Sequence, residues 1–328
     1  MEEMVEKLKA VMLGHAVGDA LGVPVEFCTR EALDSDPVTD MRGFGTHSVP
    51  AGAWSDDTSM SLAALDALCE GEVDYDAIMQ NFVRWHLDAK YTSTDSVFDV
   101  GRCCSCAVIN YFAATDGVSG AMERSRAFDF GFEGEGSNGN GSLMRIHPFV
   151  LYAHARQLPF VTWRELIDNG SRLTHAHERS RVGCLIYAFV LMHLLNEPRK
   201  DTIDLALRRA ECELCDHPEL AHYKRIFDPG FAKIPRSDIK SSGYVVDTLE
   251  AALWCLLTTD SYRECVLKAV NLGADTDTVA AVAGGVAGAL YGYEAIPQEW
   301  LGTLLRRDDI TALCTHAAGC WMGFADRS

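Results

Sequence analysis

The chain has 328 residues, of which 48% are hydrophobic, with a formal net charge of -18 and a pI near 4.9. This length suffices for one large domain or two modest ones with a substantial core. The acidic balance argues against nucleic acid as the main partner, because phosphate contacts need patches of lysine and arginine.

The N-terminal stretch, MEEMVEKLKAVMLG, carries acids where a secretory signal carries basic residues. Its apolar periodicity predicts a helix over residues 2–21. The longest uncharged apolar run, residues 279–293, is too short and too glycine-rich to span a membrane. We therefore expect a cytoplasmic protein without a membrane partner, in which the 12 cysteines are reduced.

Glycines recur every fourth residue in two predicted helices, at Gly14, Gly18 and Gly22 and again at Gly284, Gly288 and Gly292. Such spacing leaves one face of each helix without side chains, so another backbone can approach closely, at a cost in helix propensity. We predict that these two faces cross in the core.

Pro24 ends the first helix, and Glu26 follows between Val25 and Phe27. In this apolar setting, desolvation would raise the pKa of Glu26, as a general base or proton-exchanging acid requires. The alternative is a surface glutamate in a loop. Residues 29–53, rich in Pro, Gly, Asp and Thr, are predicted to form a long loop.

The first acid cluster is SDDT at residues 55–58, which opens a predicted helix over 55–69. Helices are also predicted over 75–87 and 97–112. The second of these carries three cysteines, Cys103, Cys104 and Cys106. We expect them to serve in core packing, because three residues so close on a helix do not share a face.

Residues 130–148, FGFEGEGSNGNGSLMRIHP, combine glycines and asparagines before an apolar segment. A glycine-rich loop that runs into a helix presents backbone N–H groups to an anion, typically phosphate. The motif is neither a Walker A loop nor a dinucleotide fingerprint. A flexible surface loop is the alternative.

Helices are predicted over 161–170, 182–195, 201–216, 243–257 and 262–270, with a polar loop over 218–242. His175 and His177 precede the second of these helices, and we expect hydrogen bonding or capping there, since a third metal ligand is lacking. Cys212, Cys215 and His217 form a CxxCxH, a weak indication of zinc. Two cysteines on a helix face are the preferred explanation.

The second acid cluster is DTDT at residues 275–278, which opens an apolar helix running to residue 291. Thr276 or Asp277 would suit its N-cap, and capping alone would explain acids at one helix start. If all four aspartates of the two clusters converge, their repulsion must be neutralised, most simply by a divalent cation. Carboxylate and hydroxyl ligands favour magnesium or manganese over zinc or copper.

Two further helices, over 298–306 and 310–320, complete an all-α chain with no solenoid repeat. We therefore predict one domain spanning residues 1–328.

Five motifs together resemble the ADP-ribosylglycohydrolase family, which includes the dinitrogenase-reductase-activating glycohydrolase and the ADP-ribosylarginine and ADP-ribosylserine hydrolases. They are GDALGVPVEF (18–27), SDDTSM (55–60), NGNGSLMR (138–145), LTHAH (173–177) and GADTDTVAAVAGGVAGALYG (273–292). The resemblance covers nearly the whole chain in order. It implies a compact orthogonal helical bundle with a binuclear magnesium or manganese site at helix N-termini.

The resemblance also implies roles for individual residues. Two Mg2+ or Mn2+ ions would be held by Ser55, Asp56, Asp57, Asp275, Asp277 and Thr278. The catalytic residues would be Glu26, Asp57 and Asp277, the last bridging the two metals. ADP-ribose would be held by Gly136, Asn138, Gly139, Asn140, Gly141, Ser142 and His175.

The implied activity is hydrolysis of the bond between ADP-ribose and a modified protein, with arginine as the favoured linkage and ADP-ribose as the product. Glu133 and Glu135 before the glycine loop could receive the guanidinium. The alternatives are hydrolysis of a serine linkage, hydrolysis of a small derivative such as O-acetyl-ADP-ribose, and non-catalytic ADP-ribose binding, since lens crystallins have been recruited from this family.

Overall fold

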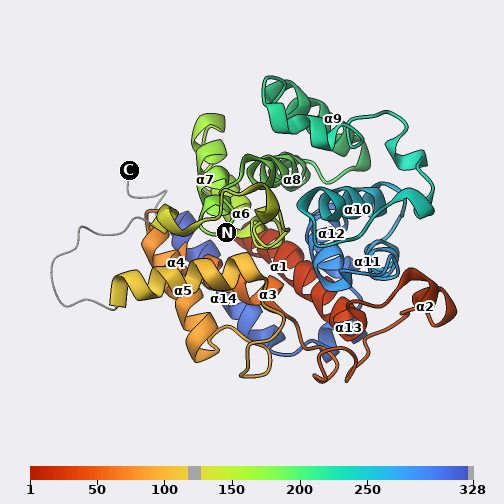
Figure 1. The fold of residues 1–328 in the computed structure, drawn as a ribbon, viewed down its shortest axis with the longest axis horizontal. Coiled ribbons are helices and arrows are strands. Elements are labelled where there is room, and N and C mark those ends of the chain that lie inside the picture. Colours follow the sequence, from red (N-terminus) through yellow and green to blue (C-terminus); the bar gives the residue numbers. More distant parts are fainter. Residues whose placement is uncertain (117–126, 324–328) are drawn as a thin grey trace.

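The computed structural model describes residues 1–116 and 127–323, and within them it confirms the predicted all-α fold (Figure 1). The described residues form no β-strand, only isolated bridges between Phe132 and His175 and between Gly139 and Tyr244. The helices are α1 (Glu2–Gly22), α2 (Arg30–Ser35), α3 (Asp56–Ala67), α4 (Tyr75–Asp88), α5 (Arg102–Asp116), α6 (His147–Ala155), α7 (Phe160–Arg172), α8 (Glu178–Asn196), α9 (Lys200–Glu213), α10 (Val245–Leu257), α11 (Tyr262–Val270), α12 (Thr276–Tyr291), α13 (Gln298–Thr303) and α14 (Arg307–Gly323). Short 3₁₀-helices η1 to η7 lie between them.

Helices α1 and α12 cross at the centre of the molecule through their glycine faces, as predicted. A Cβ atom at Gly18 would lie 2.1 Å from the Ala280 carbonyl oxygen, and one at Gly14 would lie 2.6 Å from that of Gly284. Gly288 approaches α1 as closely, but Gly292 lies outside the contact and ends α12 with a φ of 82°. The glycines therefore bring two backbones together where larger residues would hold them apart.

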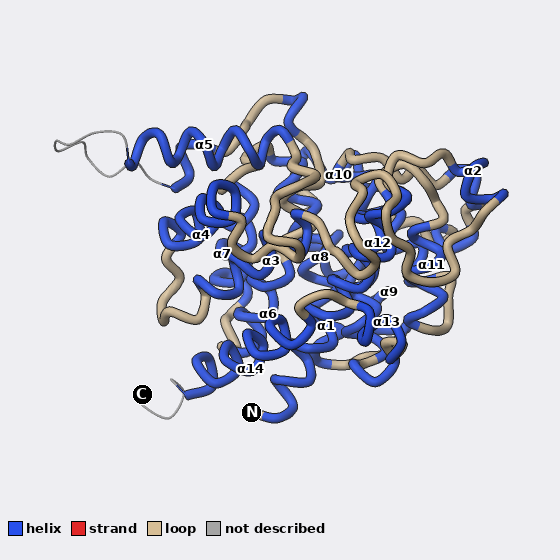
Figure 2. Tube along the Cα trace, turned by 90° about the horizontal axis from the view of Figure 1, so that it is seen from below, coloured by secondary structure: helices blue, strands red, loops and turns tan. Residues whose placement is uncertain are grey.

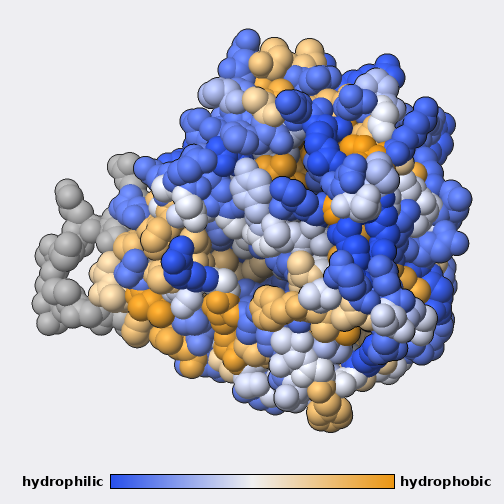
Figure 3. All heavy atoms as spheres, turned by 45° about the vertical axis from the view of Figure 1, so that its right-hand side comes forward, coloured by the Kyte–Doolittle hydropathy of each residue, from blue (hydrophilic) through white to orange (hydrophobic). Residues whose placement is uncertain are grey.

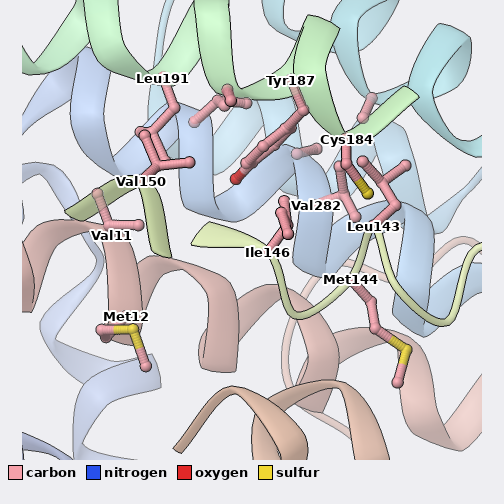
Figure 4. Packing of buried hydrophobic residues seen from close by; sticks show 14 of the residues in the cluster. Val11, Met12, Leu143, Met144, Ile146, Val150, Cys184, Tyr187, Leu191 and Val282 are labelled. Carbon is pink, nitrogen blue, oxygen red and sulfur yellow. The ribbon is translucent and has the colours of Figure 1, made fainter. Parts of the chain in front are cut away.

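Within the described part of the chain, seven other helices pack directly against this pair. Helices α3, α6, α11, α13 and α14 contact α1, and α3, α8, α10 and α11 contact α12. Helix α1 is long and apolar enough to span a membrane, but 94% of its most apolar window is buried inside the protein, as in a core helix. Figure 4 shows α8 meeting the core, where Cys184, Tyr187 and Leu191 lie above Leu143, Ile146 and Val150.

Three segments differ from the prediction. The expected loop over 29–53 contains α2, because Thr29 caps it by accepting a hydrogen bond from the Ala32 N–H. Helix α5 starts at Arg102 rather than at residue 97, since Asp99 has a φ of 52° that a helix cannot contain. The polar region over 218–242 includes three 3₁₀-helices, η4 to η6.

The long loops gather over the ends of α3, α10 and α12 (Figure 2). In a space-filling view, hydrophobic residues collect beside a hollow on a face that is otherwise mostly hydrophilic (Figure 3). The helical core thus supports one side on which long loops converge.

Candidate active site

The crossing of α1 and α12 positions the second acid cluster. At Gly22, the last residue of α1, a Cβ atom would lie 2.3 Å from the Asp277 Cα. The Thr276 hydroxyl donates to the Gly22 carbonyl oxygen at 2.8 Å. The first turn of α12 is thereby fixed against the end of α1.

Asp19 of α1 positions the first acid cluster. Its carboxylate accepts hydrogen bonds from the backbone N–H of Ser55 at 2.9 Å and from both the N–H and the hydroxyl of Thr58, the latter at 2.6 Å. These bonds satisfy the donors at the start of α3, which no helical partner can reach. Burial raises the pKa of Asp19 to about 6 despite these donors.

The two clusters meet. The Thr278 hydroxyl donates to Asp57 Oδ2 at 3.3 Å, and the Ser55 hydroxyl donates to the same oxygen at 3.1 Å. Asp275, not Thr276 or Asp277, is the N-cap of α12, and its side chain makes no capping hydrogen bond. Capping therefore does not account for Asp275, whereas Asp277 Oδ1 accepts from the Thr278 N–H at 2.8 Å.

Several oxygens of these carboxylates have no partner. Asp57 Oδ1, Asp275 Oδ1 and Asp277 Oδ2 are buried without a hydrogen bond. Burial, reinforced by neighbouring carboxylates, raises the pKa of Asp56, Asp57 and Asp277 well above the usual value. Buried oxygens that lack donors and repel one another fit a hard divalent cation. Among the described residues, two groups have ligand atoms close enough together to hold an ion, Glu26 with Asp275 and Asp277 and Glu26 with His47 and Asp99; Asp56 and Asp57 belong to neither group.

Glu26 is buried, with 5% of its surface exposed, so it is not a surface glutamate in a loop. Its Oε2 lies 2.5 Å from His47 Nε2. One carboxylate oxygen of Glu26 lies within 4.8 Å of oxygens of Asp275 and Asp277. Desolvation raises the pKa of Glu26 to about 10, and the negative charges of Asp99 and Asp275 add to the effect. The predicted direction of this shift is confirmed.

A cavity of about 310 Å³ opens beside these acids. The residues that line it include nine that the sequence analysis assigned to the site: Glu26, Asp56, Gly136, Gly139, Asn140, Gly141, His175, Asp275 and Thr278. Ser55, Asp57 and Asp277 are buried next to it and do not line it.

Two predicted substrate-binding residues, Asn138 and Ser142, also fall outside the cavity, because their side chains bond within the protein. Asn138 donates to the Glu135 carbonyl oxygen and accepts from Ser180. Ser142 is fully buried and accepts from Ser171 at 2.9 Å.

The glycine loop does not lead directly into a helix. Helix α6 begins at the buried His147, so its N-terminus does not offer N–H groups to the cavity. The loop instead lies on His175, since a Cβ atom at Gly141 would come within 2.9 Å of the His175 ring. Burial and the nearby Arg145 lower the pKa of His175 to about 3, so this imidazole is neutral.

Glu135 is already engaged, since it pairs with Arg179 at 2.7 Å and with His177 at 3.2 Å. Both Glu135 and Glu133 are exposed, and neither lines the cavity. His177 also caps α8 by accepting from the Arg179 N–H, in line with the capping interpretation.

Of the three cysteines on α5, only Cys104 is a buried core residue, as expected, whereas Cys103 and Cys106 are partly exposed. Cys103 and Cys104 also line the cavity. Cys212 lies exposed on α9, but Cys215 is exposed beyond the end of that helix. His217 caps η4 by accepting from the Glu219 N–H. Neither the cysteines nor His217 belongs to a metal-ligand cluster among the described residues.

Three residues of the site were not predicted: Asp19, His47 and Asp99. Asp19 is a charged residue on an otherwise apolar, glycine-spaced helix face, and this signal was available. His47 and Asp99 come from loops, where periodicity carries no information about which side chain turns inward.

Comparison with known proteins identifies the family. Residues 1–324 match the model of the ADP-ribosylglycohydrolase family. The ADP-ribosylarginine hydrolase Tri1 of Serratia proteamaculans is 32% identical over 315 residues, covering 95% of this chain and 78% of the relative. Tri1 of Pseudomonas putida is 33% identical, covering 92% and 74%.

The ADP-ribosyl-[dinitrogen reductase] glycohydrolase of Rhodospirillum rubrum is 30% identical over 302 residues, covering 91% of this chain and 90% of the relative. A solved structure titled ADP-ribosylglycohydrolase-related protein complex superimposes with a TM-score of 0.79 at 30% identity, covering 98% of this chain and all of its own. The chain therefore belongs to the ADP-ribosylglycohydrolase family.

Proposed function

We propose that this protein hydrolyses the N-glycosidic bond between ADP-ribose and an arginine side chain, and so reverses mono-ADP-ribosylation of proteins. The observation that carries the proposal is the convergence of two acidic helix starts, with unpartnered buried oxygens, beside a cavity. Family membership supports the ADP-ribose linkage, and the names of the Serratia and Pseudomonas relatives support arginine.

Two Mg2+ or Mn2+ ions would be held by Ser55, Asp56, Asp57, Asp275, Asp277 and Thr278. When bound, such ions grip vicinal ribose hydroxyls and make a water molecule more acidic. The buried oxygens of Asp57, Asp275 and Asp277 that have no hydrogen-bond partner would serve as metal ligands. Asp19 and Asn140 orient these ligands, the first through α3 and the second by donating to Asp275 Oδ2 at 2.9 Å.

Glu26 would handle protons. Hydrolysis removes a proton from the attacking water and adds one to the departing guanidine nitrogen. Glu26, whose Oε2 is held by His47, would take the proton from the water and pass it to the departing nitrogen. When ionised, the same carboxylate would stabilise the positive charge that develops on the ribose in an oxocarbenium-like transition state.

The glycine loop and His175 would hold the rest of ADP-ribose, with Gly136, Gly139, Asn140 and Gly141 as the lining residues. Asp99 lines the same cavity next to Glu26 and can face the guanidinium, whereas Glu133 and Glu135 do not line it. All 12 cysteines are unpaired, which is consistent with the predicted cytoplasmic location.

The test is to incubate the protein with proteins ADP-ribosylated on arginine or on serine, and with O-acetyl-ADP-ribose, in Mg2+ or in a chelator, and to measure the ADP-ribose released. Release from the arginine substrate that stops in the chelator is expected. Release only from serine or from O-acetyl-ADP-ribose would contradict the arginine assignment. Binding of ADP-ribose without any turnover would indicate a non-catalytic protein.

A further inference from the structure

Two large apolar side chains stand out from the surface near the cavity. Phe27 is 68% exposed and Phe44 is 76% exposed. Their backbones have φ angles of 64° and 59°. A positive φ is unfavourable for a bulky residue, and an exposed phenyl ring loses the hydrophobic free energy that its burial would contribute. Phe27 lines the cavity, and Phe44 lies on the loop that is hydrogen-bonded to Glu26 through Thr46. Both penalties at these two positions point to a function for the rings.

Backbone hydrogen bonds hold both residues in this conformation. The Phe27 N–H donates to the Ala274 carbonyl oxygen at 2.7 Å, and the Phe44 N–H donates to that of Val49 at 2.7 Å. The Thr46 hydroxyl donates to the Glu26 carbonyl oxygen at 2.7 Å. The loop that carries Phe44 is thus attached directly to the segment that carries Glu26.

Further rings connect this surface with the cavity. The His47 ring lies 6.3 Å from that of Phe27 and 5.2 Å from that of Phe98, measured between centroids. Glu26 and Asp99 line the cavity, and each is adjacent in sequence to one of these phenylalanines. Phe27, Phe44, His47 and Phe98 are called the aromatic rim below.

We propose that the aromatic rim binds the polypeptide around the modified arginine, so that the enzyme recognises an ADP-ribosylated protein and not ADP-ribose alone. The inference rests on the proposed function. ADP-ribose would fill the cavity, and the chain to which it is linked must then continue outward past Glu26, where the rim begins. Aromatic rings provide a large contact area at low cost in conformational entropy, as protein-binding surfaces require.

The occupant of the rim is therefore a peptide segment that contributes apolar side chains and the methylene groups of the modified arginine. The net charge of -18 favours approach of the basic surfaces on which arginine is common. A small substrate such as free ADP-ribosyl-arginine ends before it reaches Phe44, which does not line the cavity.

The test compares kcat/KM of wild type and Phe44→Ser on two substrates, an arginine-ADP-ribosylated protein and free ADP-ribosyl-arginine. The change should lower kcat/KM for the protein by about tenfold or more, as loss of an aromatic hot spot does. For the small substrate, kcat/KM should stay within about twofold. Leu205→Ser, which changes a 60% exposed residue on α9, is the control and should alter neither value.

Equal losses on both substrates, or a loss on neither, would overturn the proposal. So would sedimentation that shows wild type self-associating and Phe44→Ser monomeric, because the rim would then join two copies of the chain. If wild type releases no ADP-ribose at all, the proposed function fails. The rim is then judged by calorimetry with the ADP-ribosylated protein, which Phe44→Ser should bind more weakly than wild type while both bind ADP-ribose equally.

Discussion

Replacement of Gly22 by alanine tests how the helix crossing builds the site. The added Cβ would lie 2.3 Å from the Asp277 Cα and 2.4 Å from the Asp277 backbone nitrogen. Neither atom can rotate away, so the end of α1 and the start of α12 must separate by roughly 1 Å to reach ordinary contact. That displacement acts directly on Asp277.

The expected magnitudes follow from two opposing effects. Overpacking costs about 1–3 kcal/mol of folding free energy, and alanine regains up to about 1 kcal/mol of helix propensity. A net loss of about 1–2 kcal/mol lowers the melting temperature of a chain of this size by a few degrees, roughly 2–3 °C. A catalytic group misplaced by about 1 Å can cost about 100-fold in rate.

Calorimetric Mg2+ titration and thermal melts measure the metal affinity and the stability of Gly22→Ala, and two matched variants serve as controls. Gly18→Ala crowds the Ala280 carbonyl oxygen at 2.1 Å, one turn deeper in α1, and should lose stability while retaining more of its metal affinity. Gly319→Ala in α14 has no atom within 4 Å of the added methyl and should be as stable as wild type or more so. Wild-type stability and metal affinity in Gly22→Ala would show that the close contact between α1 and α12 does not position Asp277.

Two further predictions concern proton chemistry. Glu26→Gln should retain bound Mg2+ and ADP-ribose, measured by calorimetry, while ADP-ribose release falls; unchanged release would remove Glu26 from the mechanism. Burial raises the pKa of Asp19 from 3.8 to about 6, so the folded metal-free protein holds a proton that the unfolded chain releases, and its stability should fall as pH rises from about 4 to 6. Saturating Mg2+ should raise the melting temperature most at the upper end of this pH range. A melting temperature that changes with neither pH nor Mg2+ would count against a cluster of buried carboxylates.

The fold was largely predictable because its signals are local. Glycine spacing identified the α1–α12 crossing, and acids before apolar runs identified the starts of α3 and α12. The start of α5 was missed because the conformation of Asp99 depends on its loop and not on helix periodicity.

The site was predictable where a motif places side chains on a helix start, as for Asp56 and Asp275. It was not predictable where bonding partners are distant in sequence. Ser142 turns towards Ser171, and Glu135 turns towards Arg179, both of which depend on tertiary packing. The pairing of His47 with Glu26 likewise requires the 44–49 loop to fold over Pro24.

Metal content and ADP-ribose release in Asp277→Asn show most directly whether the two acid clusters hold a catalytic metal centre. This change preserves size and the bond that Asp277 Oδ1 accepts from the Thr278 N–H, but it removes the charge and the strong donor at the unpartnered Oδ2. If these acids hold a catalytic metal centre, bound metal should fall clearly below that of wild type, and hydrolysis of the arginine substrate should fall by several orders of magnitude. Metal content and rate close to those of wild type would contradict the claim and leave the acids a structural role only.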